Sequence, residues 1–242
     1  MQSLRHEESK NKGMSFLYTD GSTEDLYTEI SEREQEIGRK LRRYEKAKRI
    51  FDVVFASLAF VILLPFLLLI GLVIWVDDPH GSPIYVSTRC GKDRKLFRFY
   101  KFRSMCVGAD RMIENLFGKN EAKGPAFKIR EDPRLTRFGK IIRKYCIDEL
   151  PQLINVIRGD ISIVGPRPPL PREVEQYTAY QRQRLSIQPG LTCYWQIQPD
   201  KNEMSFEDWV NLDMKYIRER SFRVDMKMIW KTVRVVLFGF GL

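Results

Sequence analysis

The chain has 242 residues, which is enough for a membrane element and one ordinary domain, and its 12% of aromatic residues excludes disorder throughout. A net charge of +10 predicts an anionic partner. The four cysteines are far apart and the chain has two histidines, which excludes a disulfide framework and a His-rich metal site. Any catalysis must therefore rest on carboxylates and basic residues, with or without a bound metal.

The N-terminal fifth of the chain has two parts of different character. Residues 1–30 are polar and without periodicity, and they predict a mobile tail. Ser31 and Glu34 fit a capping box that begins a helix over residues 31–52. Apolar residues recur on one face of this helix, and lysines and arginines fill the others. This pattern predicts an amphipathic interfacial helix on anionic headgroups, with a solvated charged helix as the alternative.

Residues 53–76 form an apolar run without a charge, and about 20 such residues reach across a bilayer. Seven Lys or Arg lie between residues 39 and 49, and another seven between residues 89 and 103. Basic flanks stay on the cytoplasmic side, so a single span cannot satisfy both ends. Pro65 breaks the helical hydrogen-bond pattern near the middle of the run. We therefore expect a re-entrant membrane hairpin broken at Pro65, with a kinked span as the alternative.

Residues 77–242 alternate short candidate strands and helices, which predicts a cytoplasmic catalytic domain. Strands are expected over 84–86, 96–102 and 161–164, and helices over 108–117, 173–184 and 206–220, with a further helix that Asp148 would cap. The stretch 226–242 mixes apolar and basic residues, which is typical of a membrane-associated helix or of a core helix. The fold class predicted is α+β, mainly helical.

The candidate chemistry lies between Arg130 and Arg167, where basic residues surround the adjacent carboxylates Asp148 and Glu149. An N-cap and a glutamate favoured by the helix dipole would explain such a pair without any activity. Among arginines, however, an aspartate can attack a phosphate as a nucleophile. Mg²⁺ suits a site with one or two carboxylates and a substrate phosphate.

Six motifs in order resemble those of the bacterial sugar transferases, the monotopic polyprenol-phosphate phosphoglycosyl transferases. The motifs are Lys48-Arg-Ile-Phe-Asp52, Lys101-Phe-Arg-Ser-Met105, Asp132-Pro-Arg-Leu-Thr136, Asp148-Glu-Leu-Pro-Gln-Leu153, Gly165-Pro-Arg-Pro168 and Pro189-Gly-Leu-Thr192 with Trp195-Gln196. The resemblance covers roughly residues 45–240, and the chain looks like the small form of the family. Leu64, where members often have Ser, and Cys193, where they often have Gly, depart from the pattern.

The resemblance implies transfer of a phospho-sugar from a UDP-sugar to undecaprenyl phosphate, with release of UMP. It places the reaction at the cytoplasmic face of the bacterial inner membrane, with both termini cytoplasmic, as the first membrane step of a surface glycan pathway (exopolysaccharide, capsule or O-antigen). Asp148 would be the nucleophile that carries a covalent phospho-sugar, Glu149 would assist, and Mg²⁺ would bridge both carboxylates to the diphosphate. The expected phosphate or nucleotide contacts are Lys101, Arg103, Arg134, Arg143 and Arg167.

The expected partners are the two substrates, the lipid bilayer and downstream glycosyltransferases. Nucleic acid is not among them, because no helix pattern resembles a groove reader. The sugar is left open, and a homo-oligomer is compatible with the sequence. The rival hypothesis is a polybasic membrane adaptor without enzymatic activity, which explains the charge and the apolar run but not the ordered motifs.

Overall fold

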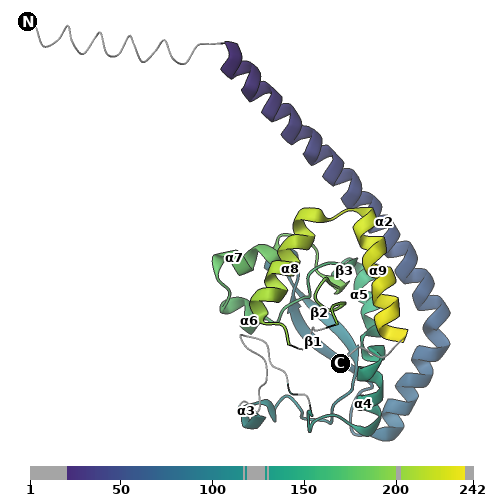
Figure 1. Ribbon diagram of the computed structural model, residues 1–242. Helices are drawn as coiled ribbons and strands as arrows, with labels where there is room; N and C mark the ends of the chain where they lie inside the picture. Colours follow the sequence, from purple (N-terminus) through teal and green to yellow (C-terminus); the bar gives the residue numbers. More distant parts are fainter. Residues whose placement is uncertain (1–20, 117, 119–128, 130, 200–202, 238–242) are drawn as a thin grey trace, which may run out of the picture. The chain divides into compact units, whose positions relative to one another are not determined.

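The computed structural model describes residues 21–116, 118, 129, 131–199 and 203–237 (Figure 1). The chain divides into two compact units, Met1–Ala47 and Lys48–Leu242. The helices are α2 (Gly21–Asp77), α3 (Ile113–Leu116), α4 (Arg137–Lys144), α5 (Leu153–Arg158), α6 (Pro171–Glu175), α7 (Ala179–Arg182), α8 (Phe206–Glu219) and α9 (Phe222–Leu237). The strands are β1 (Ile84–Cys90), β2 (Leu96–Phe102), β3 (Ser162–Val164) and β4 (Gly190–Thr192), and the 3₁₀ helices are η1 (Lys92–Arg94), η3 (Ile147–Gln152) and η4 (Gln183–Leu185).

The predicted fold class, α+β and mainly helical, is confirmed by these elements. Strands β1 and β2 form an antiparallel hairpin in which Ile84 pairs with Phe102 and Cys90 with Leu96. Strands β3 and β4 form a short parallel pair. Two of the helices expected from the sequence are shorter in the structure. Only α3 is helical among the described residues of 108–117, and the stretch 173–184 is divided because Thr178 caps a new helix.

The described part of the first unit is entirely helical and belongs to α2. Residues 21–30, which we expected in the mobile tail, are helical, and Ser31 therefore lies inside the helix and does not cap it. Ion pairs one turn apart support this helix: Glu29 with Arg33 at 2.6 Å and Glu36 with Lys40 at 2.8 Å. Residues 1–20 of the expected tail lie outside the described residues.

The second unit begins with the apolar part of α2, the one helix among the described residues that is long and apolar enough to cross a membrane. The structure does not show the predicted hairpin, because α2 continues through Pro65 to Asp77. A helix absorbs a proline by bending at the lost hydrogen bond, and the ribbon between Lys48 and Asp77 is bent (Figure 1). One face of this part is buried in the domain, at Ala56, Leu67, Ile70 and Ile74.

Both ends of the apolar run are anchored to the same unit. Before the run, Arg49 donates to two backbone carbonyls at the end of α5. Asp52 accepts hydrogen bonds at the start of β3, from the Ser162 hydroxyl at 2.7 Å and from the next backbone N–H. After the run, Asp77 accepts the backbone N–H of Phe138 at 3.4 Å, in the first turn of α4. The anchors hold the two ends on one folded body.

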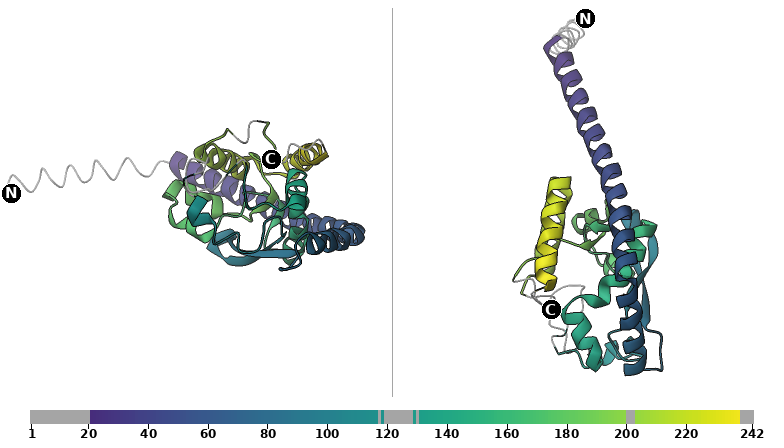
Figure 2. Two further views of the ribbon diagram at one scale, coloured as in Figure 1. Left: turned by 90° about the horizontal axis from the view of Figure 1, so that it is seen from below. Right: turned by 90° about the vertical axis from the view of Figure 1, so that its right-hand side faces the viewer.

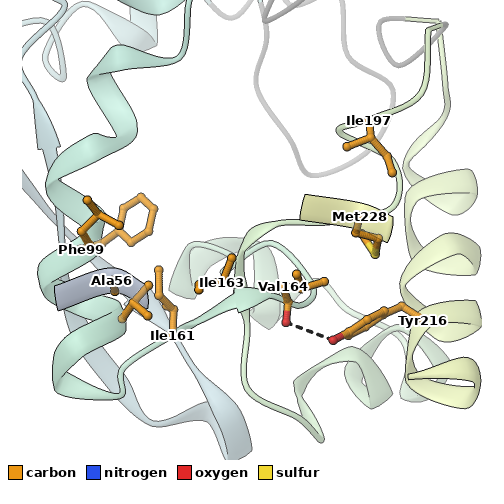
Figure 3. Close-up of a cluster of buried hydrophobic side chains, with 10 residues drawn as sticks. Ala56, Phe99, Ile161, Ile163, Val164, Ile197, Tyr216 and Met228 are labelled. Carbon is orange, nitrogen blue, oxygen red and sulfur yellow. Dashed lines mark hydrogen bonds between the residues drawn. The ribbon is translucent and has the colours of Figure 1, made fainter. Parts of the chain in front are cut away.

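The main core cluster joins α2, β2, α5, β3, α8 and α9 (Figure 3). The hydroxyl of Tyr216 donates to the carbonyl of Val164 at 3.1 Å and to Asp225 at 2.8 Å, which holds α8 and α9 against β3. Asn155 of α5, fully buried, bonds the free edge of β2: its side chain accepts the Tyr100 N–H and donates to a β2 carbonyl. These contacts fix β2, from which the candidate site is built.

Helix α9 lies beside the start of the apolar run (Figure 2). Lys48 forms a buried ion pair with Asp225 at 2.9 Å, and the rings of Phe51 and Phe222 meet edge to face at 5.4 Å. The middle of the helix still exposes a large aromatic residue, Trp230, at 60%. Among the described residues, α9 therefore combines a buried face with an exposed aromatic face, and its membrane association stays a prediction.

Candidate functional site

Asp148 and Glu149 lie in the 3₁₀ helix η3, directly after α4. Thr136 caps α4 by accepting the N–H of Gly139. Cys146 then takes a left-handed conformation, with φ of 54°, and turns the chain into η3. The prediction that Asp148 is an N-cap is wrong, because Cys146 occupies that position and Asp148 is the second residue of η3. The Asp148 carboxylate therefore does not cap the N-terminus of a helix.

Lys101 of β2 faces both carboxylates. Its Nζ lies 2.6 Å from Glu149 Oε1 and 3.7 Å from Asp148 Oδ2. Asp148 is 6% exposed, so little water reaches this group of side chains. In such surroundings the charge-assisted hydrogen bond between Lys101 and Glu149 is strong. The sequence-predicted site residues Asp148, Glu149 and Lys101 thus come together.

The two carboxyl groups differ in proton affinity. Burial raises the pKa of Asp148 and outweighs the opposing charge of Lys101, and the neighbouring Glu149 raises that pKa further. Burial acts on Glu149 too, but Lys101, Arg167 and Arg89 together hold its pKa below the usual value. Adjacent carboxylates in one site separate in this way when the cations lie closer to one of them. Asp148 is therefore the more basic of the two.

Two further predicted residues contribute positive charge to the site. Arg143 in α4 stabilises the ionised form of Asp148, and Arg167 stabilises that of Glu149. The guanidinium carbon of Arg167 lies 6.0 Å from the ring centroid of Trp195, which stacks on Trp209 at 4.3 Å. The Arg167 guanidinium of the rigid Pro-Arg-Pro loop is thus stabilised by a cation–π interaction with the Trp195 indole.

The two other predicted substrate contacts bind the protein itself. Arg103 donates to Ser82 O at 2.9 Å and is ion-paired with Asp78, at the exit of α2. Arg134 forms a buried two-point ion pair with Asp132, at 2.8 and 2.6 Å. Their contact with substrate stays a prediction. In the structure, both arginines stabilise the conformation of nearby chain segments.

Arg89 at the end of β1 was not among the predicted site residues, yet it is one of the cations that stabilise ionised Glu149. The sequence placed the first strand over 84–86, but β1 extends to Cys90, so that Arg89 lies opposite Phe97 and shares a sheet face with Lys101. Arg130, which the sequence placed in the same basic stretch, lies outside the described residues.

The described residues contain no group of three or more His, Cys, Asp or Glu side chains that could hold a metal ion. Asp148 and Glu149 nevertheless offer two adjacent carboxylates, of which one is buried. Mg²⁺ in phosphate-handling sites is typically held by one or two carboxylates, with the remaining ligands from substrate phosphate and water. The residues fit a Mg²⁺ ion that binds together with a phosphate substrate.

Known proteins similar to this chain show the family to which it belongs. The model of a family described as bacterial sugar transferase matches residues 42–239. The exopolysaccharide production protein ExoY of Sinorhizobium fredii is 40% identical over 200 residues, which cover 81% of this chain and 87% of that protein. The galactosyl transferase CpsE of Streptococcus agalactiae is 44% identical over 195 residues, and the undecaprenyl-phosphate galactose phosphotransferase of Salmonella typhimurium is 34% identical over 231 residues. These cover 81% and 94% of this chain but only 43% and 46% of the two relatives, so the chain spans less than half of each.

Arg103→Lys is expected to lower the melting temperature by about 2–6 °C, since a lysine cannot replace the guanidinium fork that reaches both Asp78 and Ser82. Thermal unfolding of the detergent-purified protein measures this. Arg143→Lys is the control, because no hydrogen bond of the Arg143 side chain holds the described chain together, and it should unfold like the wild type. An unchanged melting temperature in Arg103→Lys would refute the structural role.

Proposed function

We propose that this chain, which belongs to the bacterial sugar transferase family, transfers a sugar 1-phosphate from a UDP-sugar to undecaprenyl phosphate and releases UMP. The observation that carries the proposal is the contact of Lys101 with the adjacent carboxylates Asp148 and Glu149, inside the region that the family model matches. The acceptor comes from the name of the Salmonella relative, and a role in exopolysaccharide or capsule synthesis from that of ExoY.

In the first step, the Asp148 carboxylate attacks the phosphorus that bears the sugar. A bond forms between the carboxylate oxygen and this phosphorus, the bond to the second phosphate breaks, and UMP leaves with the electron pair. The raised pKa of Asp148 supports this role, because a more basic carboxylate is the better nucleophile of the two. A phosphate oxygen of undecaprenyl phosphate then attacks the same phosphorus and releases the Asp148 carboxylate.

The cations around Asp148 lower the repulsion between a carboxylate and an anionic phosphate. Lys101 is the nearest of them to both carboxylates, and Arg143 and Arg167 add charge from two other elements. We propose that Asp148 and Glu149 hold Mg²⁺, which when bound would neutralise charge on the diphosphate. Glu149, with its lowered pKa, is the carboxylate that stays ionised for this task.

We further propose that the apolar part of α2 enters the bilayer without crossing it, so that both ends lie on the cytoplasmic side. A crossing helix would place its two sets of polar anchors on opposite sides of the membrane, but Asp52 and Asp77 are anchored to one folded unit. The face turned away from the domain is apolar and exposed, as at Val61, Leu68 and Leu72. Both basic flanks agree with this topology.

The polybasic membrane adaptor stays the rival hypothesis. It accounts for the net charge and for the exposed apolar face of α2. It does not account for a buried aspartate beside a second carboxylate and a lysine, an arrangement that costs free energy without a ligand to use it. An adaptor would bind anionic vesicles without turnover, and the exchange of Asp148 would leave its binding unchanged.

Asp148→Asn is expected to reduce UMP release by at least about 10³-fold, because an amide cannot form the covalent intermediate. The assay uses purified protein, undecaprenyl phosphate, Mg²⁺ and a panel of UDP-sugars, which also identifies the sugar. Asp93→Asn makes the same exchange at an exposed turn and should leave the rate unchanged. Full activity in Asp148→Asn would remove Asp148 as the nucleophile.

The rate is expected to fall on acidification at a higher pH than an ordinary aspartate would give. The pKa of Asp148 is raised, so its reactive ionised form is lost earlier as the pH decreases. Lys101→Met removes a charge that lowers this pKa, so the acid limb should move to still higher pH. Profiles of kcat/KM against pH for both proteins measure the shift. A limb that moves to lower pH in Lys101→Met would contradict this assignment.

Cysteines placed at the two ends of the apolar run test its topology. Ile50→Cys and Val76→Cys replace exposed side chains, 66% and 67% exposed. We expect an impermeant thiol reagent to label neither position in intact cells and both in permeabilised cells. Labelling of one end in intact cells would show a crossing helix.

A further inference from the structure

We infer that Arg89 is a further substrate-binding residue, whose guanidinium binds the diphosphate of the nucleotide donor together with that of Arg167. The inference rests on the proposed function and adds to it a residue outside the six motifs.

Arg89 points to the site because of its position in the hairpin. It pairs with Phe97, and directly opposed residues of an antiparallel pair lie on the same face, so Arg89, Phe99 and Lys101 share one face. The guanidinium carbon of Arg89 lies 5.4 Å from the Phe99 ring centroid, and Lys101 Nζ lies 5.7 Å from the same centroid. The buried Phe99 ring therefore stabilises two cations, Arg89 and Lys101. Lys101 is also bonded to Glu149.

The Arg89 side chain has unused binding capacity. It donates one hydrogen bond, from Nη1 to the carbonyl of Pro168 at 3.2 Å, while its buried Nε has no partner. Within the described part of the chain, Arg89 forms no ion pair with a carboxylate. Burial and the like charge of Arg167 lower the pKa of Arg89 to about 10. Two guanidinium groups held near each other with donors to spare are stabilised by a bound anion.

The charges around the two carboxylates fit a diphosphate. Four cations, Lys101, Arg89, Arg143 and Arg167, act on Asp148 and Glu149. The cations outnumber the two carboxylates, and Glu173 is a further carboxylate that acts on Arg89. The diphosphate of a UDP-sugar has one negative charge on each phosphate, which these cations would stabilise.

The surroundings of the two ends of the hairpin distinguish the donor from the lipid acceptor. Phe102, next to Lys101, is buried against Leu67 and Ile70 of the apolar part of α2. Cys90, next to Arg89, is buried in a different cluster, with residues of α6 and α8 and none of α2. The neighbour of Lys101 therefore packs on the apolar part of α2, and the neighbour of Arg89 packs on α6 and α8. A water-soluble nucleotide is expected to bind on the side of Arg89, and a lipid phosphate on the side of Lys101.

Arg89 also touches the loop that carries Arg167, and this gives an alternative role. Arg89 bonds the Pro168 carbonyl, and the backbone N–H of Cys90 bonds the carbonyl of Pro169 at 2.9 Å. In that role Arg89 would only position Arg167 and would not touch substrate. The two roles differ in whether Arg89 still matters once Arg167 has been replaced.

The test compares the kinetics of Arg89→Met with those of the wild type. The KM for the UDP-sugar and the inhibition constant of UDP should rise by about 10- to 100-fold, since charge-assisted hydrogen bonds to phosphate are lost. Inhibition by uridine, which has no phosphate, and the KM for undecaprenyl phosphate should not change. Arg98→Met is the matched control, because it removes one exposed charge from the other face of the same hairpin and should have no effect.

UDP binding is also measured by calorimetry in the Asp148→Asn background, where turnover does not interfere. Arg89→Met with Arg167→Met should bind UDP more weakly than Arg167→Met alone. Equal binding would show that Arg89 acts only through Arg167, and a changed KM for the lipid phosphate alone would assign Arg89 to the acceptor; either result overturns the inference. If Arg89→Met does not fold, Arg89→Lys, which keeps the charge but not the fork, should still weaken UDP binding, and wild-type UDP affinity in it would overturn the inference.

The outcomes separate this inference from the proposed function. A wild-type protein that releases UMP from no UDP-sugar would refute the proposed function. A wild-type protein that turns over, with unchanged UDP inhibition in Arg89→Met, would refute only the role of Arg89.

Discussion

Two adjacent carboxylates in a buried site depend on cations placed beside them, and other elements of the second unit supply those cations. Desolvation alone would protonate both groups. Lys101 comes from β2, Arg143 from α4 and Arg167 from the loop after β3. Each element is too short to be stable by itself, so the site exists only when the hairpin, η3 and the loop pack together. The site is thus a property of the tertiary structure and of no single motif.

Packing around β2 holds these elements in register. Asn155 bonds both an N–H and a carbonyl of β2 and connects the strand to α5, the helix that follows η3. The close approach of Gly165 and Gly190 brings β4 to the start of the Pro-Arg-Pro loop: a Cβ on Gly190 would lie 2.0 Å from the backbone of Gly165. The strand that carries Lys101 is therefore fixed by a buried side chain, and the loop that carries Arg167 by a backbone approach that few substitutions preserve.

Features that depend on local sequence could be predicted. Alternation and turn residues predicted the hairpin, and the ordered motifs predicted the family that the comparisons confirm. Features that depend on tertiary contacts could not. The roles of Arg103 and Arg134 in holding the chain follow from partners that their charge does not identify, Asp78 and Asp132. The left-handed turn at Cys146 is not marked by a glycine in the sequence, and it puts Cys146 at the helix end where Asp148 was wrongly expected.

The apolar part of α2 was also predicted only in part from the sequence, and it packs against the strand that carries Lys101. Composition predicted that it enters a bilayer, but a proline alone does not decide between a bend and a reversal, and the structure has a continuous helix. Its buried face contacts Phe102, the neighbour of Lys101 on the opposite face of β2. The two-residue period of one strand thus places a contact with α2 and a cation of the candidate site side by side. Because a strand is stiff over this distance, the position of the apolar part of α2 sets that of Lys101 and of Asp148 beside it. Under the proposed function, the depth of α2 in the lipid would then set where a soluble nucleotide and a lipid phosphate meet.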